Sequence, residues 1–130
     1  MIVDTSAIVA ILRGEPERAA LRRVLEDAPR RSVSAATLVE TFSVMDRGTQ
    51  PTTARDVDAW LSEQDVQVAP FTERQARIAR EAYRDFGRGS GHPAQLNLGD
   101  CFAYALAKVT GEPLLFKGDD FVHTDVRSAL

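Results

Sequence analysis

Short apolar runs alternate with longer helical segments along this chain, and this alternation constrains its fold more than any other feature. Four short runs rich in apolar residues are predicted to be strands: Met1–Val3, Ser32–Ser34, Val66–Ala69 and Pro113–Phe116. A further strand is expected near Val126. Strands that alternate with helices along a sequence are typical of βαβ units, which place their strands in a parallel sheet. The sequence therefore predicts an α/β fold with a central parallel sheet.

The segments around these strands are predicted to be helices: Ala7–Leu12, Glu17–Asp27, Ala35–Met45, Thr52–Glu63, Thr72–Phe86 and Asn97–Val109. Apolar residues recur on one face of most of them, as expected for helices that pack against a sheet. In the third helix the expected core residues are Leu38, Val39 and Phe42.

The composition is that of an ordinary globular protein. Its 130 residues suit one domain, residues 1–130, with a single core. No apolar run is long enough to cross a bilayer, and the N-terminus has no signal-peptide pattern, so we expect a cytoplasmic protein without membrane contact. The lone Cys101 has no disulfide partner, which suits a reducing compartment. A net charge of −3 is unusual for a nucleic-acid-binding protein, but acids gathered at one site would leave the remaining surface near neutral.

Acidic residues follow two of the predicted strands directly. Asp4 comes after the first strand, and Asp119 and Asp120 come after the last one through a Lys-Gly pair. The carboxyl ends of strands in open α/β sheets are where ligands bind. Alternatively, Asp4 serves only as a helix N-cap, and the later pair belongs to an ordinary turn.

Two further acids lie on predicted helices where apolar residues surround them. Glu40 stands in an apolar stretch, where an unpaired carboxylate is costly unless it reaches water. Asp100 lies in the first turn of a largely apolar helix, and Asn97 with Asp100 also resembles a capping box. Carboxylates brought together repel one another, and a divalent cation reverses that balance. Because the candidate ligands are all oxygen donors, the expected ion is Mg²⁺ or Mn²⁺.

Four sequence blocks, in this order and at this spacing, resemble the PIN domain, and more narrowly the toxin subunit of VapBC-type toxin–antitoxin pairs. The blocks are Ile2 to Ala7, Glu40 in its short helix, Leu98-Gly99-Asp100-Cys101-Phe102-Ala103-Tyr104-Ala105, and Leu114 to Phe121. The resemblance extends from Met1 to about Asp125. It implies a three-layer α/β/α sandwich around the parallel sheet. It also implies a homodimer with Mg²⁺- or Mn²⁺-dependent endoribonuclease activity on RNA. A cognate antitoxin is expected to inhibit this activity, and the protein would contact operator DNA only indirectly, through that antitoxin.

The resemblance also assigns site residues. Asp4, Glu40 and Asp100 match the first three acids of the family, and Thr5 or Ser6 matches its polar residue after the first acid. Asp120 is the better match for the fourth acid, although Asp119 could share that role. In the expected mechanism a metal-activated water hydrolyses the RNA phosphodiester. Asp4 and Asp100 would hold the metal, Glu40 would orient or deprotonate the water, and Asp120 would complete the site.

Five arginines recur every three or four residues from the fifth predicted helix onward: Arg74, Arg77, Arg80, Arg84 and Arg88. Guanidinium groups on one face suit contacts with RNA phosphates. Alternatively, the arginines form an ordinary solvated helix face in a chain whose basic residues are nearly all arginine.

Alternative enzyme classes lack their required residues. A haloacid-dehalogenase-type phosphatase needs an acid two residues after its nucleophile, where this chain has Ser6, and neither the acid pattern of a receiver domain nor a P-loop is present. One alternative stays open, namely a catalytically weak binding module whose acids hold a structural ion or an antitoxin arginine.

Overall fold

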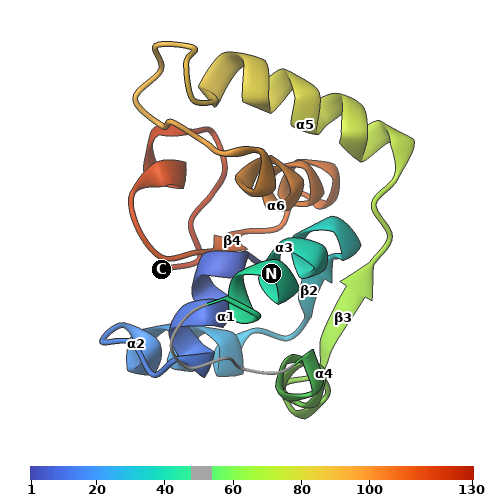
Figure 1. Ribbon diagram of the computed structural model, residues 1–130, viewed down its shortest axis with the longest axis vertical. Coiled ribbons are helices and arrows are strands. Elements are labelled where there is room, and N and C mark those ends of the chain that lie inside the picture. The colour runs from blue at the N-terminus through green and yellow to red at the C-terminus, as the bar shows by residue number, and fades with distance from the viewer. Residues whose placement is uncertain (48–53) are drawn as a thin grey trace.

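The computed structural model describes residues 1–47 and 54–130. Its centre is a parallel sheet of four strands, β1 (Ile2–Val3), β2 (Arg31–Ser34), β3 (Val66–Ala69) and β4 (Leu114–Leu115), in the order β3-β2-β1-β4. Strands β2, β3 and β4 are labelled in Figure 1. The predicted parallel α/β fold is confirmed. The strand expected near Val126 does not form; the C-terminal segment makes only an isolated bridge between Leu114 and Ser128.

Helices connect and cover the strands: α1 (Thr5–Leu12), α2 (Arg18–Asp27), α3 (Ala35–Met45), α4 (Ala54–Glu63), α5 (Glu73–Phe86) and α6 (Leu98–Thr110), followed by the short 3₁₀ helix η1 (Asp120–His123). The first helix begins two residues earlier than predicted, because Asp4 caps it directly after β1. The predicted start of the fourth helix, Thr52, lies outside the described residues. None of the described helices has the length and apolarity needed to cross a membrane.

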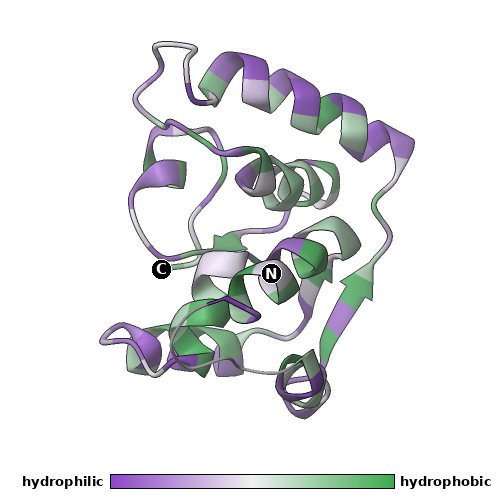
Figure 2. Ribbon diagram, viewed as in Figure 1, coloured by the Kyte–Doolittle hydropathy of each residue, from purple (hydrophilic) through white to green (hydrophobic). Residues whose placement is uncertain are grey.

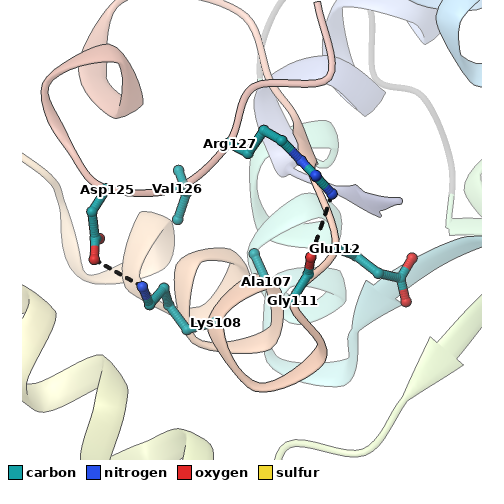
Figure 3. Close-up of a pocket in the computed structure, with 7 residues that line it drawn as sticks. All are labelled: Ala107, Lys108, Gly111, Glu112, Asp125, Val126 and Arg127. Carbon is teal, nitrogen blue, oxygen red and sulfur yellow. Dashed lines mark hydrogen bonds and ion pairs between the residues drawn. The ribbon is translucent and has the colours of Figure 1, made fainter.

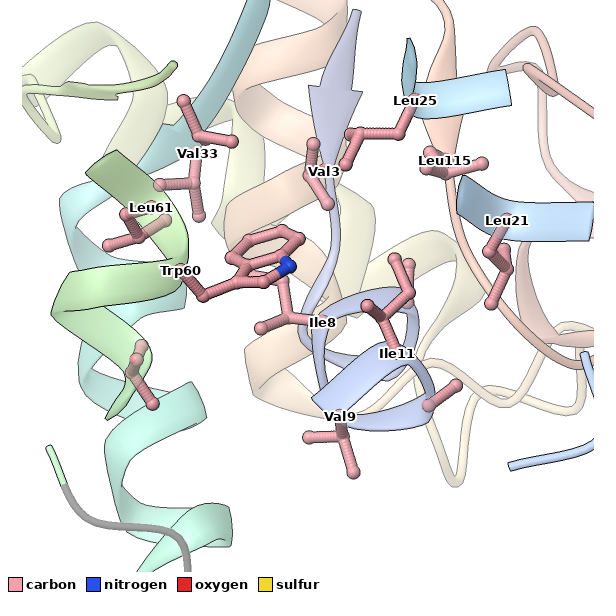
Figure 4. Close-up of a cluster of buried hydrophobic side chains, with 14 of the residues drawn as sticks. Val3, Ile8, Val9, Ile11, Leu21, Leu25, Val33, Trp60, Leu61 and Leu115 are labelled. Carbon is pink, nitrogen blue, oxygen red and sulfur yellow. The ribbon is translucent and has the colours of Figure 1, made fainter. Parts of the chain in front are cut away.

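The core lies on both faces of the sheet. Neighbouring residues of a strand point to opposite faces, so Ile2 and Val3 enter different clusters. Val3 packs with α1, α2 and α4, including Ile8 and Trp60 (Figure 4). On the other face, Ile2 packs with α6, which α5 covers in turn, and the outer side of α5 is largely hydrophilic (Figure 2). The arrangement is an α/β/α sandwich.

The expected core of α3 is partly wrong. Leu38 and Phe42 are partly buried against the first cluster, but Val39 is 69% exposed. The fully buried face of the helix instead carries Thr37, Thr41 and Met45, at a spacing of four residues. Val39 points away from that face because α3 turns its threonine side toward α1, which it contacts. The buried threonines lie next to the acidic site described below.

Candidate active site

Asp4 is a buried carboxylate with two different oxygens. It follows β1 and caps α1, and its Oδ2 accepts hydrogen bonds from the backbone N–H of Ser6 at 2.9 Å and from Ser6 Oγ at 2.6 Å. The side chain is only 1% exposed, and Oδ1 is buried without a hydrogen-bond partner among the described residues. Burial raises the pKa of Asp4. The capping role and a ligand-binding role are therefore compatible, since each uses a different oxygen.

Ser6 connects Asp4 to the end of β4. Its Oγ donates to Asp4 and accepts a hydrogen bond from the backbone N–H of Lys117 at 3.0 Å. The Lys117 ammonium in turn forms ion pairs with Glu15 and Glu17. Hydrogen bonds through Ser6 thus connect the residues that follow the carboxyl ends of the neighbouring strands β1 and β4.

Glu40 is held by the hydroxyl of Thr5. The Thr5 Oγ1 donates to Glu40 Oε2 at 2.8 Å and lies 3.1 Å from Thr41 Oγ1. Thr41 also hydrogen-bonds to the carbonyl oxygen of Thr37 at 3.0 Å. Burial raises the pKa of Glu40, and the nearby Asp4 charge raises it further. The carboxylate that stands in an apolar stretch of the sequence therefore has a polar partner from α1.

Asp100 has both a structural and an electrostatic role. The predicted capping box is confirmed, with Asp100 Oδ2 accepting from the Asn97 N–H at 2.7 Å and Asn97 Oδ1 accepting from the Asp100 N–H at 2.9 Å. Burial raises the pKa of Asp100 to about 7, with further contributions from the charges of Asp4, Glu40 and Asp120. One cap hydrogen bond lowers the pKa but does not offset these effects.

Four of the five candidate acids therefore interact electrostatically, with Asp100 affected by the charges of the other three. Asp120, at the start of η1, raises the pKa of both Asp4 and Asp100. Asp119 does not contribute to these shifts; it is the N-cap residue of η1, and its backbone carbonyl accepts a hydrogen bond from the Val122 N–H. The structure thus links Asp4, Glu40, Asp100 and Asp120 through the electrostatic effects of their charges on one another's pKa values.

This donor set fits a divalent cation that keeps part of its water shell. Within residues 1–47 and 54–130, no three His, Cys, Asp or Glu side chains lie close enough to enclose an ion by themselves. Mg²⁺ usually retains several waters and takes only one or two carboxylates directly. The buried, unpartnered Oδ1 of Asp4 and the mutual repulsion around Asp100 are the features that a cation would compensate.

Several residues of the site carried no strong sequence signal. Thr37 and Thr41 show a spacing of four residues on an otherwise apolar helix, a pattern that could have indicated a buried polar face. Lys117 and Gly99 stand in the matching sequence blocks, but only the folded chain shows what they contact.

The predicted arginine face lies on α5, away from these hydrogen bonds. Arg74, Arg77, Arg80 and Arg84 are all exposed on the helix, and Arg88 follows two residues beyond its end. Arg77 pairs with Glu73, and Arg84 pairs with Asp85. No hydrogen bond or ion pair between described residues links these arginines to the four acids.

A separate cavity of about 220 Å³ lies at the opposite end of α6 from Asp100 (Figure 3). Its charged groups are already engaged: Lys108 pairs with Asp125, and Arg127 donates to the carbonyl oxygen of Gly111. This cavity is not part of the acidic site.

An α/β/α sandwich with carboxylates at the carboxyl edge of a parallel sheet is an arrangement suited to metal-dependent chemistry. The sequence model of the PIN domain matches residues 1–127. The chain therefore belongs to the PIN-domain family. It is 56% identical over 129 residues to ribonuclease VapC42 of Mycobacterium tuberculosis, covering 99% of this chain and 98% of the relative. It is also 47% identical over 126 residues to ribonuclease VapC of Mycolicibacterium smegmatis, covering 97% of each chain.

Solved structures show the same fold. A crystal structure of M. tuberculosis VapC20, described as a Sarcin-Ricin loop cleaving toxin, superposes with a TM-score of 0.70 at 19% identity, covering 96% of this chain and 95% of that one. A toxin–antitoxin complex from Klebsiella pneumoniae gives a TM-score of 0.67 at 15% identity, covering 95% and 92%. At these identities the comparison supports the fold alone.

Proposed function

We propose that this protein is the ribonuclease toxin of a toxin–antitoxin pair, acting as a Mg²⁺- or Mn²⁺-dependent endoribonuclease. The observation that carries the proposal is the buried Oδ1 of Asp4, which has no hydrogen-bond partner among the described residues and belongs to one of three acids whose charges raise the pKa of Asp100, together with Glu40 and Asp120. Full-length similarity to VapC ribonucleases supports the same activity.

Each acid has a distinct role in this proposal. Asp4 and Asp100 hold the divalent ion, which when bound lowers the pKa of water and neutralises charge on the phosphate. Glu40 orients the attacking water and accepts its proton. Thr5 occupies Oε2 of Glu40, which leaves Oε1 for that contact, and because burial raises its pKa, Glu40 is a stronger base than an exposed glutamate. Asp120, which follows β4 at the start of η1, would complete the set of acids around the ion.

The remaining features of a VapBC-type toxin belong to the same proposal. The chain forms a single PIN domain, assembles as a homodimer in the cytoplasm, and is inhibited by a cognate antitoxin that alone contacts operator DNA. The exposed arginines of α5 with Arg88 contact RNA phosphates. Within the described residues Arg77 and Arg84 form ion pairs and Arg88 donates to the carbonyl oxygen of Gln95, so the exposed Arg74 and Arg80 are the most available for such contacts.

The activity is tested by incubating the purified protein with structured RNA and Mg²⁺. We expect endonucleolytic cleavage that EDTA abolishes and that Mg²⁺ or Mn²⁺ restores. The products should carry 5′-phosphate and 3′-hydroxyl ends, because water rather than the ribose hydroxyl attacks. Equal cleavage in EDTA, or 2′,3′-cyclic phosphate products, would contradict the mechanism. Ion binding without any cleavage would favour the binding-module alternative.

The fourth acid is tested by a pair of adjacent substitutions. Asp120→Asn is expected to lower kcat by roughly 10- to 100-fold, because in the proposed site Asp120 supplies part of the negative charge that would help to hold the divalent ion. Asp119→Asn removes the same charge one residue away and should leave kcat within about twofold. Single-turnover RNA cleavage distinguishes the two variants, and a larger loss from Asp119→Asn would reverse the assignment.

A further inference from the structure

Gly99 occupies a position where the backbone does not require glycine. It is the second residue of α6, and its φ lies outside the left-handed region that Gly14 and Gly111 adopt. Alanine is the more favourable residue at an ordinary helical position. The reason for glycine must therefore lie in the space around its Cα.

That space is filled by the carboxylate of Glu40. A Cβ placed on Gly99 would overlap the Cδ, Oε1 and Oε2 atoms of Glu40, which reaches α6 from the neighbouring α3. The Glu40 carboxylate therefore packs against the Cα of Gly99, in the space that a Cβ would fill. The hydroxyl of Thr5, at 2.8 Å from Oε2, holds the same group through a hydrogen bond.

We propose that Gly99 is a positioning residue for Glu40, and that its missing side chain keeps the carboxylate in reach of both Thr5 and the reacting water. The catalytic part of this inference rests on the proposed function, whereas the packing part does not. The overlapped atoms form the far end of a flexible side chain. An alanine at this position leaves the fold intact and turns the carboxylate away from Thr5.

The first test is the kinetics of Gly99→Ala. We expect kcat to fall by about 100-fold with KM changed by less than about threefold, because a displacement of about 1 Å at a reacting group costs that much. The affinity for Mn²⁺, measured by calorimetry, should stay within about threefold of the unchanged protein. A loss of Mn²⁺ affinity as large as that of Asp4→Asn would show that the substitution acts through the neighbouring Asp100, and would overturn the proposal.

The second test is a double-mutant cycle between Gly99 and Glu40, measured by thermal unfolding. It does not depend on whether the protein cleaves RNA. In a Glu40→Ala background, Gly99→Ala meets no obstacle and should raise Tm by about 2–4 °C through helix propensity. With Glu40 present, the same substitution breaks the Thr5 contact, so the gain should vanish. Equal Tm shifts in the two backgrounds would overturn the inference.

The outcomes separate this inference from the proposed function. If the unchanged protein does not cleave RNA, the proposed function fails, while the Tm cycle still tests the contact. If Gly99→Ala alone does not fold, folding of the double variant would support the contact, and failure of both would contradict it.

Discussion

Asp4→Asn is expected to abolish RNA cleavage, with kcat falling by about 10³-fold or more, while the protein stays folded. The substitution keeps the shape of the side chain and its cap contact with Ser6, but it removes the charge at the buried Oδ1 that a cation would need. Because burial raises the pKa of Asp4, the ionised carboxylate is unfavourable in the metal-free fold. We therefore expect the Tm of the metal-free variant to be unchanged or higher.

The matched control is Asp58→Asn, which removes the same charge from an exposed position on α4. It should leave both kcat and Tm nearly unchanged. Single-turnover cleavage and thermal unfolding without divalent ions are the two measurements. Full cleavage activity of Asp4→Asn would refute its role as a ligand, and a large drop in its Tm would show that its main role is structural.

The stability of the metal-free protein is expected to fall as the pH rises from about 4 to about 7. Burial and neighbouring acids raise the pKa of Asp100 from 3.8 to about 7, so the folded state retains a proton that the unfolded state has released. The stabilisation associated with that proton is complete below the pKa that Asp100 has in the unfolded state. It is lost as the pH rises through the pKa that Asp100 has in the folded state. The rise in pKa from 3.8 to about 7 corresponds to an upper limit of ~4 kcal/mol in the free energy of unfolding, lost over the whole range between these two pKa values.

Mg²⁺ should reverse this loss, because it binds the ionised site. A concentration of 100 times the dissociation constant adds about 2.7 kcal/mol to the free energy of unfolding. The rise in Tm on adding Mg²⁺ should accordingly be larger at pH 8 than at pH 5. Thermal unfolding across this range with and without Mg²⁺ provides the measurement.

Asp100→Asn is the control for this prediction. It should weaken the pH dependence without removing it, because burial also raises the pKa values of Asp4 and Glu40, and it should reduce the response to Mg²⁺. The exposed acids Glu17 and Asp85 do not contribute to this fall in stability. Hydrogen bonds and ion pairs lower their pKa values, so both acids lose their protons at a lower pH. Stability that rises between about pH 4 and pH 7 in the metal-free protein would contradict the electrostatic description of the site.

Much of the fold followed from local patterns. The apolar runs predicted the four strands, and helical periodicity predicted the helices to within about two residues wherever the structure describes them. The capping box at Asn97 was also visible in the sequence, because its hydrogen bonds join residues three positions apart. Val39 was misassigned because apolarity alone does not decide which side of a helix faces the protein.

The sequence by itself determined which acids are candidates and that parallel strands would bring their carboxyl ends to one edge. Only the tertiary structure decided how these acids are held: Ser6 joins Asp4 to Lys117, and Thr5 holds Glu40 against Gly99. It also showed that the charge of Asp120, and not that of Asp119, raises the pKa values of Asp4 and Asp100. The physical reason is that desolvation, steric overlap and Coulomb interactions depend on distances between residues that lie far apart along the chain, and local periodicity does not encode those distances.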